Sequence, residues 1–237
     1  KNPIGTGPYK FVEWISGDHT TLTANEDYWG TKPAIKNIVI QVVADTNTQI
    51  LGLQNGDYDV VRSPSIDVCT RLDGNADVAW DSTLSTGRIS LYLNDWTGAC
   101  KDINFRKAVQ AGIDKQMIND GVYAGRSEIL NVDMCSNYLS FVTEADGVEV
   151  VPYDQEAAKE YLAKSNYNGE EFAVSVPSGS SLENVGKIIQ AQLMEIGINC
   201  TVKATDYPTY SGEFANRTYE AYIINNLCSL VDADGMY

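Results

Sequence analysis

The pattern that most constrains the fold is an alternation of strand and helix signals late in the chain. Apolar residues alternate with others from Phe172 to Val176, as in a strand. From Leu182 to Ile196 they recur every three or four positions, as in a helix, until Gly197 stops the pattern. Ile198 to Val202 then alternates again. Strand, helix and strand in this order predict a parallel pair joined by a right-handed crossover, so this region is of the α/β class.

The same alternation continues on both sides of this segment. Asp154 can cap a preceding helix that Gly169 ends. Tyr207 to Phe214 predicts a further helix, and Tyr219 to Ile224 predicts a further strand. The whole region is therefore expected to be α/β.

The first part of the chain is richer in strand and turn signals. Aromatic and β-branched residues in Tyr9 to Trp14 and Thr20 to Thr23 flank the hairpin connection Ser16-Gly17-Asp18. Ile35 to Val43 is largely apolar on both faces, as in a central strand, and a short helix then ends at Gly56. Strands are expected to dominate this part.

A connection divides the two parts. Arg88 to Leu93 alternates as a strand and stops at Asn94, whereas Asp102 can cap the next helix. Residues 95–101 lack a regular pattern. We therefore expect a first lobe at residues 1–94, a connection at 95–101 and a second lobe at 102–237.

Charge and hydropathy exclude two classes of protein. The chain has 17 Lys and Arg against 32 Asp and Glu, a formal net charge of -15. Such a surface repels the phosphates of nucleic acids, so no nucleic-acid partner is expected. No apolar run approaches the ~18 residues that a membrane-spanning helix needs.

Motifs for metal binding and catalysis are sparse. The five cysteines are scattered without a C-x-x-C pair, and His19 is expected in an exposed hairpin loop, so no metal site and no cofactor are predicted. We expect most cysteines to be buried as small apolar residues. The sequence does not decide whether two of them form a single disulfide. Asp and Glu residues are plentiful, so the sequence does not exclude a catalytic acid/base pair of carboxylates such as glycosidases use.

Three aromatic residues near the N-terminus have two interpretations. Trp14, Tyr28 and Trp29 could line a site for a sugar or a peptide. Core packing is the commoner role of aromatic residues at strand positions, and we expect it here.

Several segments resemble one family of proteins. G-T-G-P-Y-K-F from Gly5 is followed by W-x-x-G-D and then by L-x-x-N-x-D-Y-W-G, which ends at Gly30. Later segments also match in order and spacing: they are L-Q-N-G-D-Y-D-V from Leu53, D-I-N-F-R-K-A-V-Q-A-G-I-D-K from Asp102 and Y-D-Q-E-A-A-K-E-Y-L-A-K-S-N-Y from Tyr153. These segments resemble the extracytoplasmic solute-binding proteins of ABC transporters, in the peptide- and nickel-binding family.

The resemblance implies a fold and a role. It implies a two-lobed, type II periplasmic-binding-protein-like α/β fold, present here as a partial chain that lacks N- and C-terminal parts of the family's sequence. It also implies a non-enzymatic monomer that captures a small polar ligand, most often a peptide, and delivers it to ABC permease subunits in the membrane. The location it implies is extracytoplasmic, either periplasmic or lipid-anchored at the outer face of the cell membrane.

The resemblance also indicates where a ligand binds. Many family members have W-x-x-D-Y-x-D-P after the strand that corresponds to Tyr219 to Ile224, where the tryptophan packs on the ligand and the first aspartate holds a peptide's ammonium group. Aligning the later D-P with Asp232 places Asn226 at the tryptophan and Ser229 at the anchoring aspartate. Both family side chains are thus replaced, which argues against binding of a free peptide N-terminus. We expect Asn226, Ser229, Asp232 and Asn94 to contact ligand, with Asn94 ending an earlier strand.

Two functions from other classes stay open at this point. One is an acidic carbohydrate-active hydrolase that uses paired carboxylates. The other is a surface adhesin built on the same fold.

Overall fold

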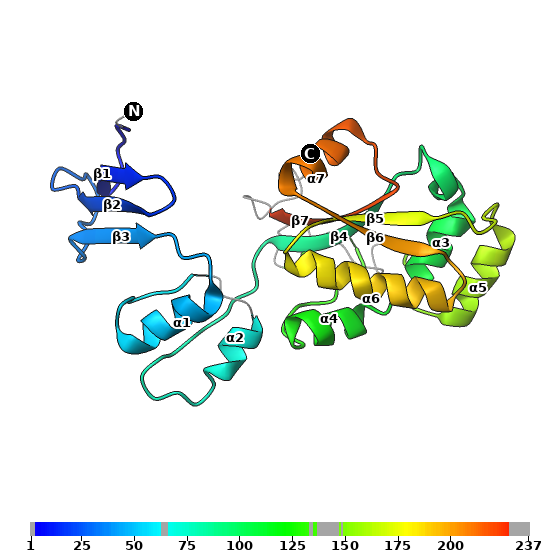
Figure 1. The fold of residues 1–237 in the computed structure, drawn as a ribbon, viewed down its shortest axis with the longest axis horizontal. Helices are drawn as coiled ribbons and strands as arrows, with labels where there is room; N and C mark the ends of the chain where they lie inside the picture. Colours follow the sequence, from blue (N-terminus) through cyan, green and yellow to red (C-terminus); the bar gives the residue numbers. More distant parts are fainter. Residues whose placement is uncertain (1–2, 63–65, 133–134, 137–146, 148, 228–237) are drawn as a thin grey trace. The chain divides into compact units, whose positions relative to one another are not determined.

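The chain forms two compact units, Lys1–Trp80 and Asp81–Tyr237. The computed structural model describes residues 3–62, 66–132, 135–136, 147 and 149–227 (Figure 1). None of the described helices is long and apolar enough to cross a membrane.

The first unit contains a three-stranded antiparallel sheet. Its strands are β1 (Tyr9–Ile15), β2 (His19–Ala24) and β3 (Asn37–Gln41), in the order β1-β2-β3. The predicted hairpin joins β1 to β2, and Gly17 takes a positive φ of 77° in its turn. β3 is an edge strand of this sheet rather than the central strand that its two apolar faces predicted.

Two helices complete the first unit. In α1 (Thr46–Asn55), the Asp45 side chain caps the first turn by accepting from the backbone N–H of Thr48. Gly56 ends α1, as expected, with a left-handed φ of 81°. The short helix α2 (Ile66–Arg71) follows.

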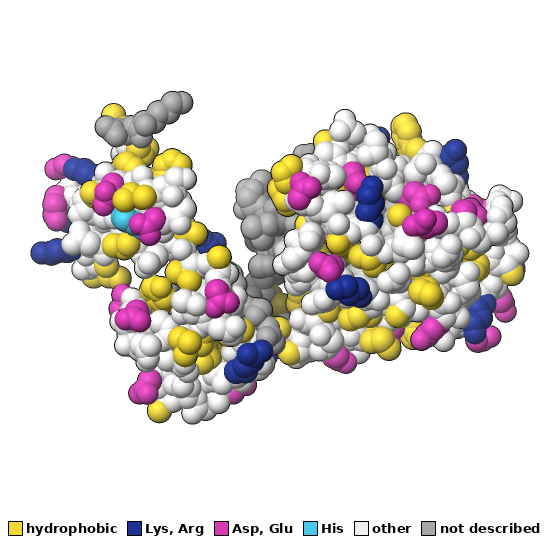
Figure 2. Space-filling view, viewed as in Figure 1, with side chains coloured by type: hydrophobic (Ala, Val, Ile, Leu, Met, Phe, Trp, Pro, Cys, Tyr) yellow, Lys and Arg dark blue, Asp and Glu magenta, His cyan; other side chains and the backbone are white. Residues whose placement is uncertain are grey.

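Some predicted side-chain environments in the first unit differ from the structure. Trp14 and Trp29 are 65% and 82% exposed rather than in a core. Trp14 and Ile40 both lie opposite Thr20 on neighbouring strands, on a face of the small sheet where both remain exposed. His19 begins strand β2 instead of lying in the loop, and it lies between acidic side chains (Figure 2). Its ring nitrogens are 3.0 Å from Asp18 and 3.4 Å from Glu13, and these contacts raise its pKa.

The second unit is built on a four-stranded mixed sheet in the order β4-β7-β5-β6. β5, β6 and β7 are parallel, and β4 runs antiparallel to β7 at one edge. The strands are β4 (Gly87–Leu93), β5 (Phe172–Pro177), β6 (Cys200–Thr205) and β7 (Ala221–Leu227). The other elements are the 3-10 helix η1 (Gly98–Lys101), α3 (Ile103–Ala111), α4 (Lys115–Tyr123), α5 (Gln155–Lys164), α6 (Ser181–Glu195) and α7 (Tyr207–Asn216).

The division between the units differs from the expected one. We expected the connection at 95–101, but the contacts divide the chain between Trp80 and Asp81. The physical reason is that β4 pairs along its whole length with β7, from Gly87 opposite Leu227 to Leu93 opposite Ala221. Periodicity predicts that a strand exists but does not say which strand is its partner.

Helices cover the two faces of the sheet in the second unit. Figure 1 shows α6 on one face and α7 on the other. The connection from β5 to β6 runs one way along the sheet, whereas the connection from β6 to β7 passes back over β5. Right-handed connections that run in opposite directions place their helices on opposite faces, as observed.

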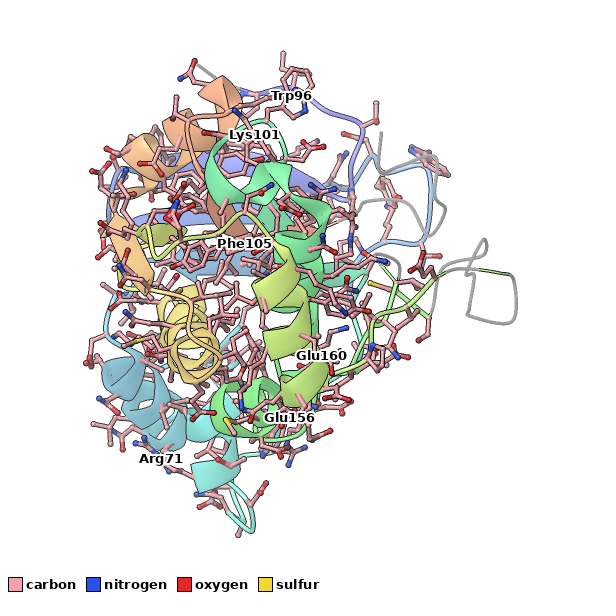
Figure 3. The ribbon with its side chains drawn as sticks, turned by 90° about the vertical axis from the view of Figure 1, so that its right-hand side faces the viewer. Arg71, Trp96, Lys101, Phe105, Glu156 and Glu160 are labelled. Carbon is pink, nitrogen blue, oxygen red and sulfur yellow. The ribbon has the colours of Figure 1, made fainter. Side chains whose placement is uncertain are left out.

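The main core lies between the sheet and the helices α3, α5 and α6. Val174, Val176 and Leu193 are completely buried there. Phe105 on α3 packs edge-on against Phe172, with ring centroids 5.2 Å apart. Figure 3 places Phe105 in the interior and Glu160 on the outer side of α5.

The cysteines follow the expected pattern where they are described. Cys69, Cys100, Cys135 and Cys200 are free thiols, and all four are buried. Burial raises the pKa of Cys100 and of Cys200 to about 12, so neither is a reactive thiolate.

Candidate functional site

The carboxyl ends of three parallel strands form one edge of the sheet in the second unit. β5 ends at Pro177, β6 at Thr205 and β7 at Leu227. The antiparallel strand β4 begins at the same edge, because Gly87 lies opposite Leu227. The two helices that follow β5 and β6 also begin at this edge.

The connections leave this edge in opposite directions. The chain after β5 enters α6 on one face of the sheet, and the chain after β6 enters α7 on the other face (Figure 1). In open α/β sheets, ligands bind in the crevice that such diverging connections leave at the carboxyl ends. The backbone N–H of Ser178 donates to the carbonyl of Thr205 at 2.7 Å and so joins the two connections. The topology therefore places a candidate ligand site beside Ser178 and Thr205.

The start of α6 is held by side chains from its own first turns. Ser180 Oγ donates to the Pro177 carbonyl at 2.7 Å rather than capping the helix. Glu183 accepts from the backbone N–H of Gly179 at 3.1 Å and from Lys187 Nζ at 2.8 Å. The Lys187 hydrogen bond is the larger cause of the lowered pKa of Glu183, and Gly179 adds to it. This carboxylate already occupies part of the helix N-terminus.

The start of α7 presents an aromatic side chain. Asp206 caps α7 by accepting from the backbone N–H of Thr209 at 3.0 Å and from its Oγ1 at 2.9 Å. These bonds, the backbone one first, lower the pKa of Asp206. The next residue, Tyr207, is 70% exposed. An exposed ring at the carboxyl end of a strand can stack on a ligand, so Tyr207 is a candidate site residue.

We did not single out Tyr207 from the sequence. A signal was present, because Asp206 is a capping residue placed directly before the predicted helix Tyr207 to Phe214 and shortly after a predicted strand. The first helical residue after such a cap lies at the ligand-binding edge of an α/β sheet.

Asn226 lies at this edge but within a strand. We expected it in a loop, whereas β7 continues through Asn226 to Leu227. Its Nδ2 donates to the hydroxyl of Tyr92 at 2.7 Å, and its partner across the ladder is Arg88, a buried residue. The amide oxygen of Asn226 has no hydrogen-bond partner in the described part of the chain. The predicted contact between Asn226 and ligand stays a prediction.

Asn94 lies at the other end of the same strand pair. Its Nδ2 donates to the carbonyls of Arg217 and Tyr219, at 3.1 and 2.9 Å, and its Oδ1 accepts from the backbone N–H of Trp96. Arg88, the residue opposite Asn226, and Asn94 therefore lie at opposite ends of β4, roughly 20 Å apart for a strand of this length. The structure does not bring Asn94 and Asn226 together, and the ligand contact predicted for Asn94 stays untested.

The other two predicted site residues, Ser229 and Asp232, lie outside the described residues. Among the described residues, no group of three His, Cys, Asp or Glu side chains could hold a metal ion.

Comparison with known sequences gives one family over the whole chain. The family model described as "Bacterial extracellular solute-binding proteins, family 5 Middle" matches residues 1–237. The chain is 27% identical over 222 residues to the oligopeptide-binding protein AppA of Bacillus subtilis (strain 168), covering 87% of this chain and 40% of AppA. It is 24% identical over 221 residues to the nickel-binding periplasmic protein of Escherichia coli (strain K12), covering 85% of this chain and 41% of that protein. The chain spans about two-fifths of the length of these relatives.

Comparison with solved structures gives the same fold. The ABC transporter-associated periplasmic binding protein DppA from Helicobacter pylori, in complex with the peptide STSA, is similar with a TM-score of 0.85 at 22% identity. That match covers 99% of this chain and 45% of DppA. The predicted type II periplasmic-binding-protein-like α/β fold is confirmed.

Proposed function

The chain belongs to the bacterial extracellular solute-binding proteins of family 5, and on this basis we propose that it is the ligand-capturing component of an ABC importer. The observation that carries the proposal is the family match over residues 1–237. The ligand is a small polar molecule, and a peptide or peptide-like molecule is the first choice. Relatives named for oligopeptide and nickel binding support this range.

The proposed mechanism is reversible binding at the carboxyl edge of the β4-β7-β5-β6 sheet. Tyr207 offers an aromatic surface and Asn226 offers an amide oxygen, which suit the apolar and polar parts of a peptide-like ligand. Binding proteins of this class enclose ligand between two lobes that close about a hinge. Release to a membrane permease then needs only reopening, without any bond being broken.

The hydrolase alternative lacks support. Glycoside hydrolysis needs a general acid whose pKa is raised, so that it keeps its proton near neutral pH. At the candidate site, the pKa values of Glu183 and Asp206 are both lowered by hydrogen bonds. The relatives above are named as binding proteins. We therefore propose a non-enzymatic role, and the adhesin alternative has no relative among those described here.

We further propose an extracytoplasmic location, periplasmic or lipid-anchored, and a monomeric protein that meets the permease subunits of its transporter. The family's description as extracellular supports the location. Nucleic acid is not among the proposed partners, because the net charge of -15 repels phosphates.

Isothermal titration calorimetry of the full-length protein tests the proposed function. The ligand set is di- to hexapeptides, oligosaccharides and nickel chelates. We expect one class to bind, and we expect Tyr207→Ala to weaken that binding about tenfold. Tyr153→Ala is the matched control, because Tyr153 is an exposed tyrosine beside α5 and lies outside the candidate site. If the protein instead hydrolyses a glycoside, and substitution of one carboxylate abolishes this activity, the hydrolase interpretation would replace the proposal.

A further inference from the structure

A cavity of about 1010 Å³ lies within the second unit, beside the edge strand β4. It is bordered by β4, α3, α4, α6 and the segment after α4. Its described lining includes no residue from the connections 177–181 and 205–207 and neither Tyr207 nor Asn226, although it shares Arg88 and Tyr92 of β4 with the surroundings of Asn226. Its volume is at the upper end of the range for small-molecule sites.

The floor of this cavity is aliphatic. It is formed by side chains from three elements: Ile89 and Leu91 of β4, Val109 of α3, and Val185 and Ile189 of α6. Ile89 is 39% exposed, although its neighbours on the floor belong to the core. An apolar chain in the cavity would remove this surface from water, which is favourable.

One basic side chain at the cavity has no acidic partner. Lys115 Nζ donates to the carbonyl of Leu130 at 2.7 Å and to Asn131 Oδ1 at 3.3 Å, and all three residues line the cavity. In the described part of the chain, no carboxylate lies within ion-pair distance of Lys115. The adjacent carboxylate, Asp114, caps α4 by accepting from the backbone N–H groups of Gln116 and Met117.

Burial makes this unpaired ammonium group unfavourable. It lowers the pKa of Lys115, because a neutral carbonyl and amide do not replace the hydration of a positive charge. A carboxylate brought by a ligand would supply the missing negative charge. The carboxylates among the described lining residues are those of Glu128 and Glu149, and neither lies within ion-pair distance of Lys115.

Arg106 adds to this positive character. Its Nη1 donates to the carbonyls of Cys100 and Lys101, at 2.7 and 3.2 Å, and the residue lines the cavity. By contrast, Lys107 is paired with Glu149 at 3.1 Å. Arg106 also lies near the Asp102 carboxylate, whose pKa it helps to lower, so among the described residues the positive charge without a nearby carboxylate is that of Lys115.

We propose that this cavity binds an amphipathic monocarboxylate, with its carboxylate on Lys115 and its aliphatic chain on the floor formed by β4, α3 and α6. The ligand is distinct from the one captured at the carboxyl edge of the sheet. The polar and apolar halves of the cavity match the two halves of such a molecule.

Calorimetry on the full-length protein with octanoate as the probe tests this proposal, and octanol serves as the uncharged comparison. We expect octanoate to bind at one site per chain and octanol to bind about tenfold more weakly. Lys115→Met keeps the length of the side chain without its charge, and it should remove this preference for octanoate. Lys164→Met is the control, because Lys164 is an exposed lysine on α5 away from the cavity. It should leave octanoate binding unchanged.

A second variant guards against a folding defect in Lys115→Met. Ile89→Trp fills part of the floor and should abolish octanoate binding, while circular dichroism and the thermal midpoint report whether the fold is kept. Equal binding of octanoate and octanol, or octanoate binding unchanged in Lys115→Met, would overturn the proposal. So would the absence of octanoate binding, as would occur if further polypeptide fills the cavity in the full-length protein. Peptide binding in the same variants should be unchanged, so the two proposals can fail separately.

Discussion

Asn226 at the end of β7 donates a 2.7 Å hydrogen bond from Nδ2 to the hydroxyl of Tyr92 on β4. The bond fixes the amide plane of Asn226, so that Nδ2 is directed at Tyr92 while Oδ1, which has no partner among the described residues, can accept from a ligand. A side chain held in one orientation loses less conformational entropy when a ligand binds. Tyr92 therefore acts on the proposed ligand contact without touching the ligand itself.

Removal of this hydroxyl tests the relationship. Tyr92→Phe should weaken ligand binding about three- to tenfold, because the Asn226 amide is no longer oriented. It should lower the free energy of unfolding by about 0.5–1.5 kcal/mol, the usual net value of one hydrogen bond. Calorimetry and urea denaturation measure the two effects, and Tyr153→Phe on an exposed tyrosine is the control. Unchanged affinity with lowered stability would assign the Asn226–Tyr92 bond to the fold alone.

For Asn94 we expect the opposite outcome, a loss of stability without a loss of ligand affinity. Its amide makes three hydrogen bonds to backbone groups of Trp96, Arg217 and Tyr219. Asn94→Ala should lower the free energy of unfolding by about 1–3 kcal/mol, because three part-buried backbone groups lose their hydrogen-bond partner. We expect ligand affinity to be unchanged in the variant that stays folded. A large loss of affinity at unchanged stability would instead support the ligand contact predicted from the sequence.

Much of the second unit could be predicted from the sequence because its signals are local. The parallel pair β5 and β6 with the helix α6 between them follows from apolar periodicity and from Gly197, which takes a positive φ of 99° after the helix. The caps of α3 and α5 were equally visible as Asp102 and Asp154.

The features that we did not predict depend on pairing between distant parts of the chain. β7 runs on through Asn225 and Asn226, two residues that favour turns, because Arg88 and Ile89 on β4 extend the ladder opposite them. Asn226 was predicted from the family motif and Asn94 from the end of a predicted strand, but the antiparallel pairing of β4 with β7 places them at opposite ends. The cavity at Lys115 also has no signal in the sequence, because its walls come from helices, strands and connecting segments that are far apart in the chain.

Glu213 should make stability depend on pH. Burial alone would raise the pKa of Glu213, but hydrogen bonds from Lys203 and from Ser175 Oγ outweigh it and leave the pKa lowered. A lowered folded-state pKa stabilises the fold above the unfolded-state value, and this contribution is lost as the pH falls through the folded-state value. Urea denaturation of the wild type should therefore show stability falling in the acid range below about pH 4.5.

Glu213→Gln should remove this part of the pH dependence. It should also lower stability at neutral pH by about 1–3 kcal/mol, since Lys203 loses a charged partner. Glu160→Gln is the control, because Glu160 is an exposed carboxylate on α5. An unchanged slope of stability against pH in Glu213→Gln would show that other carboxylates carry the effect.

Replacing two glycines by alanine should change the free energy of unfolding in opposite directions. Gly98 in η1 has a left-handed φ of 50°, which residues with a Cβ rarely adopt, and an added Cβ would also meet the Glu220 carboxylate, which would have to move. Gly98→Ala should therefore lower the free energy of unfolding by at least about 1 kcal/mol. Gly212 lies in α7 with open space around it, so Gly212→Ala should raise it by about 0.5–1 kcal/mol. Equal effects of the two substitutions in urea denaturation would contradict this assignment.

The last prediction concerns the amino terminus of a peptide ligand. Ser229 stands where the resemblance implies an anchoring aspartate, and a serine hydroxyl does not balance an ammonium charge removed from water. An N-acetylated peptide should therefore bind to within a factor of about three of the free peptide in calorimetry. Ser229→Asp should create a preference for the free amino terminus of about tenfold, because it restores a charged partner. A wild-type protein that already requires the free ammonium group would mean that another carboxylate holds it, and Asp232 would be the first to replace by asparagine.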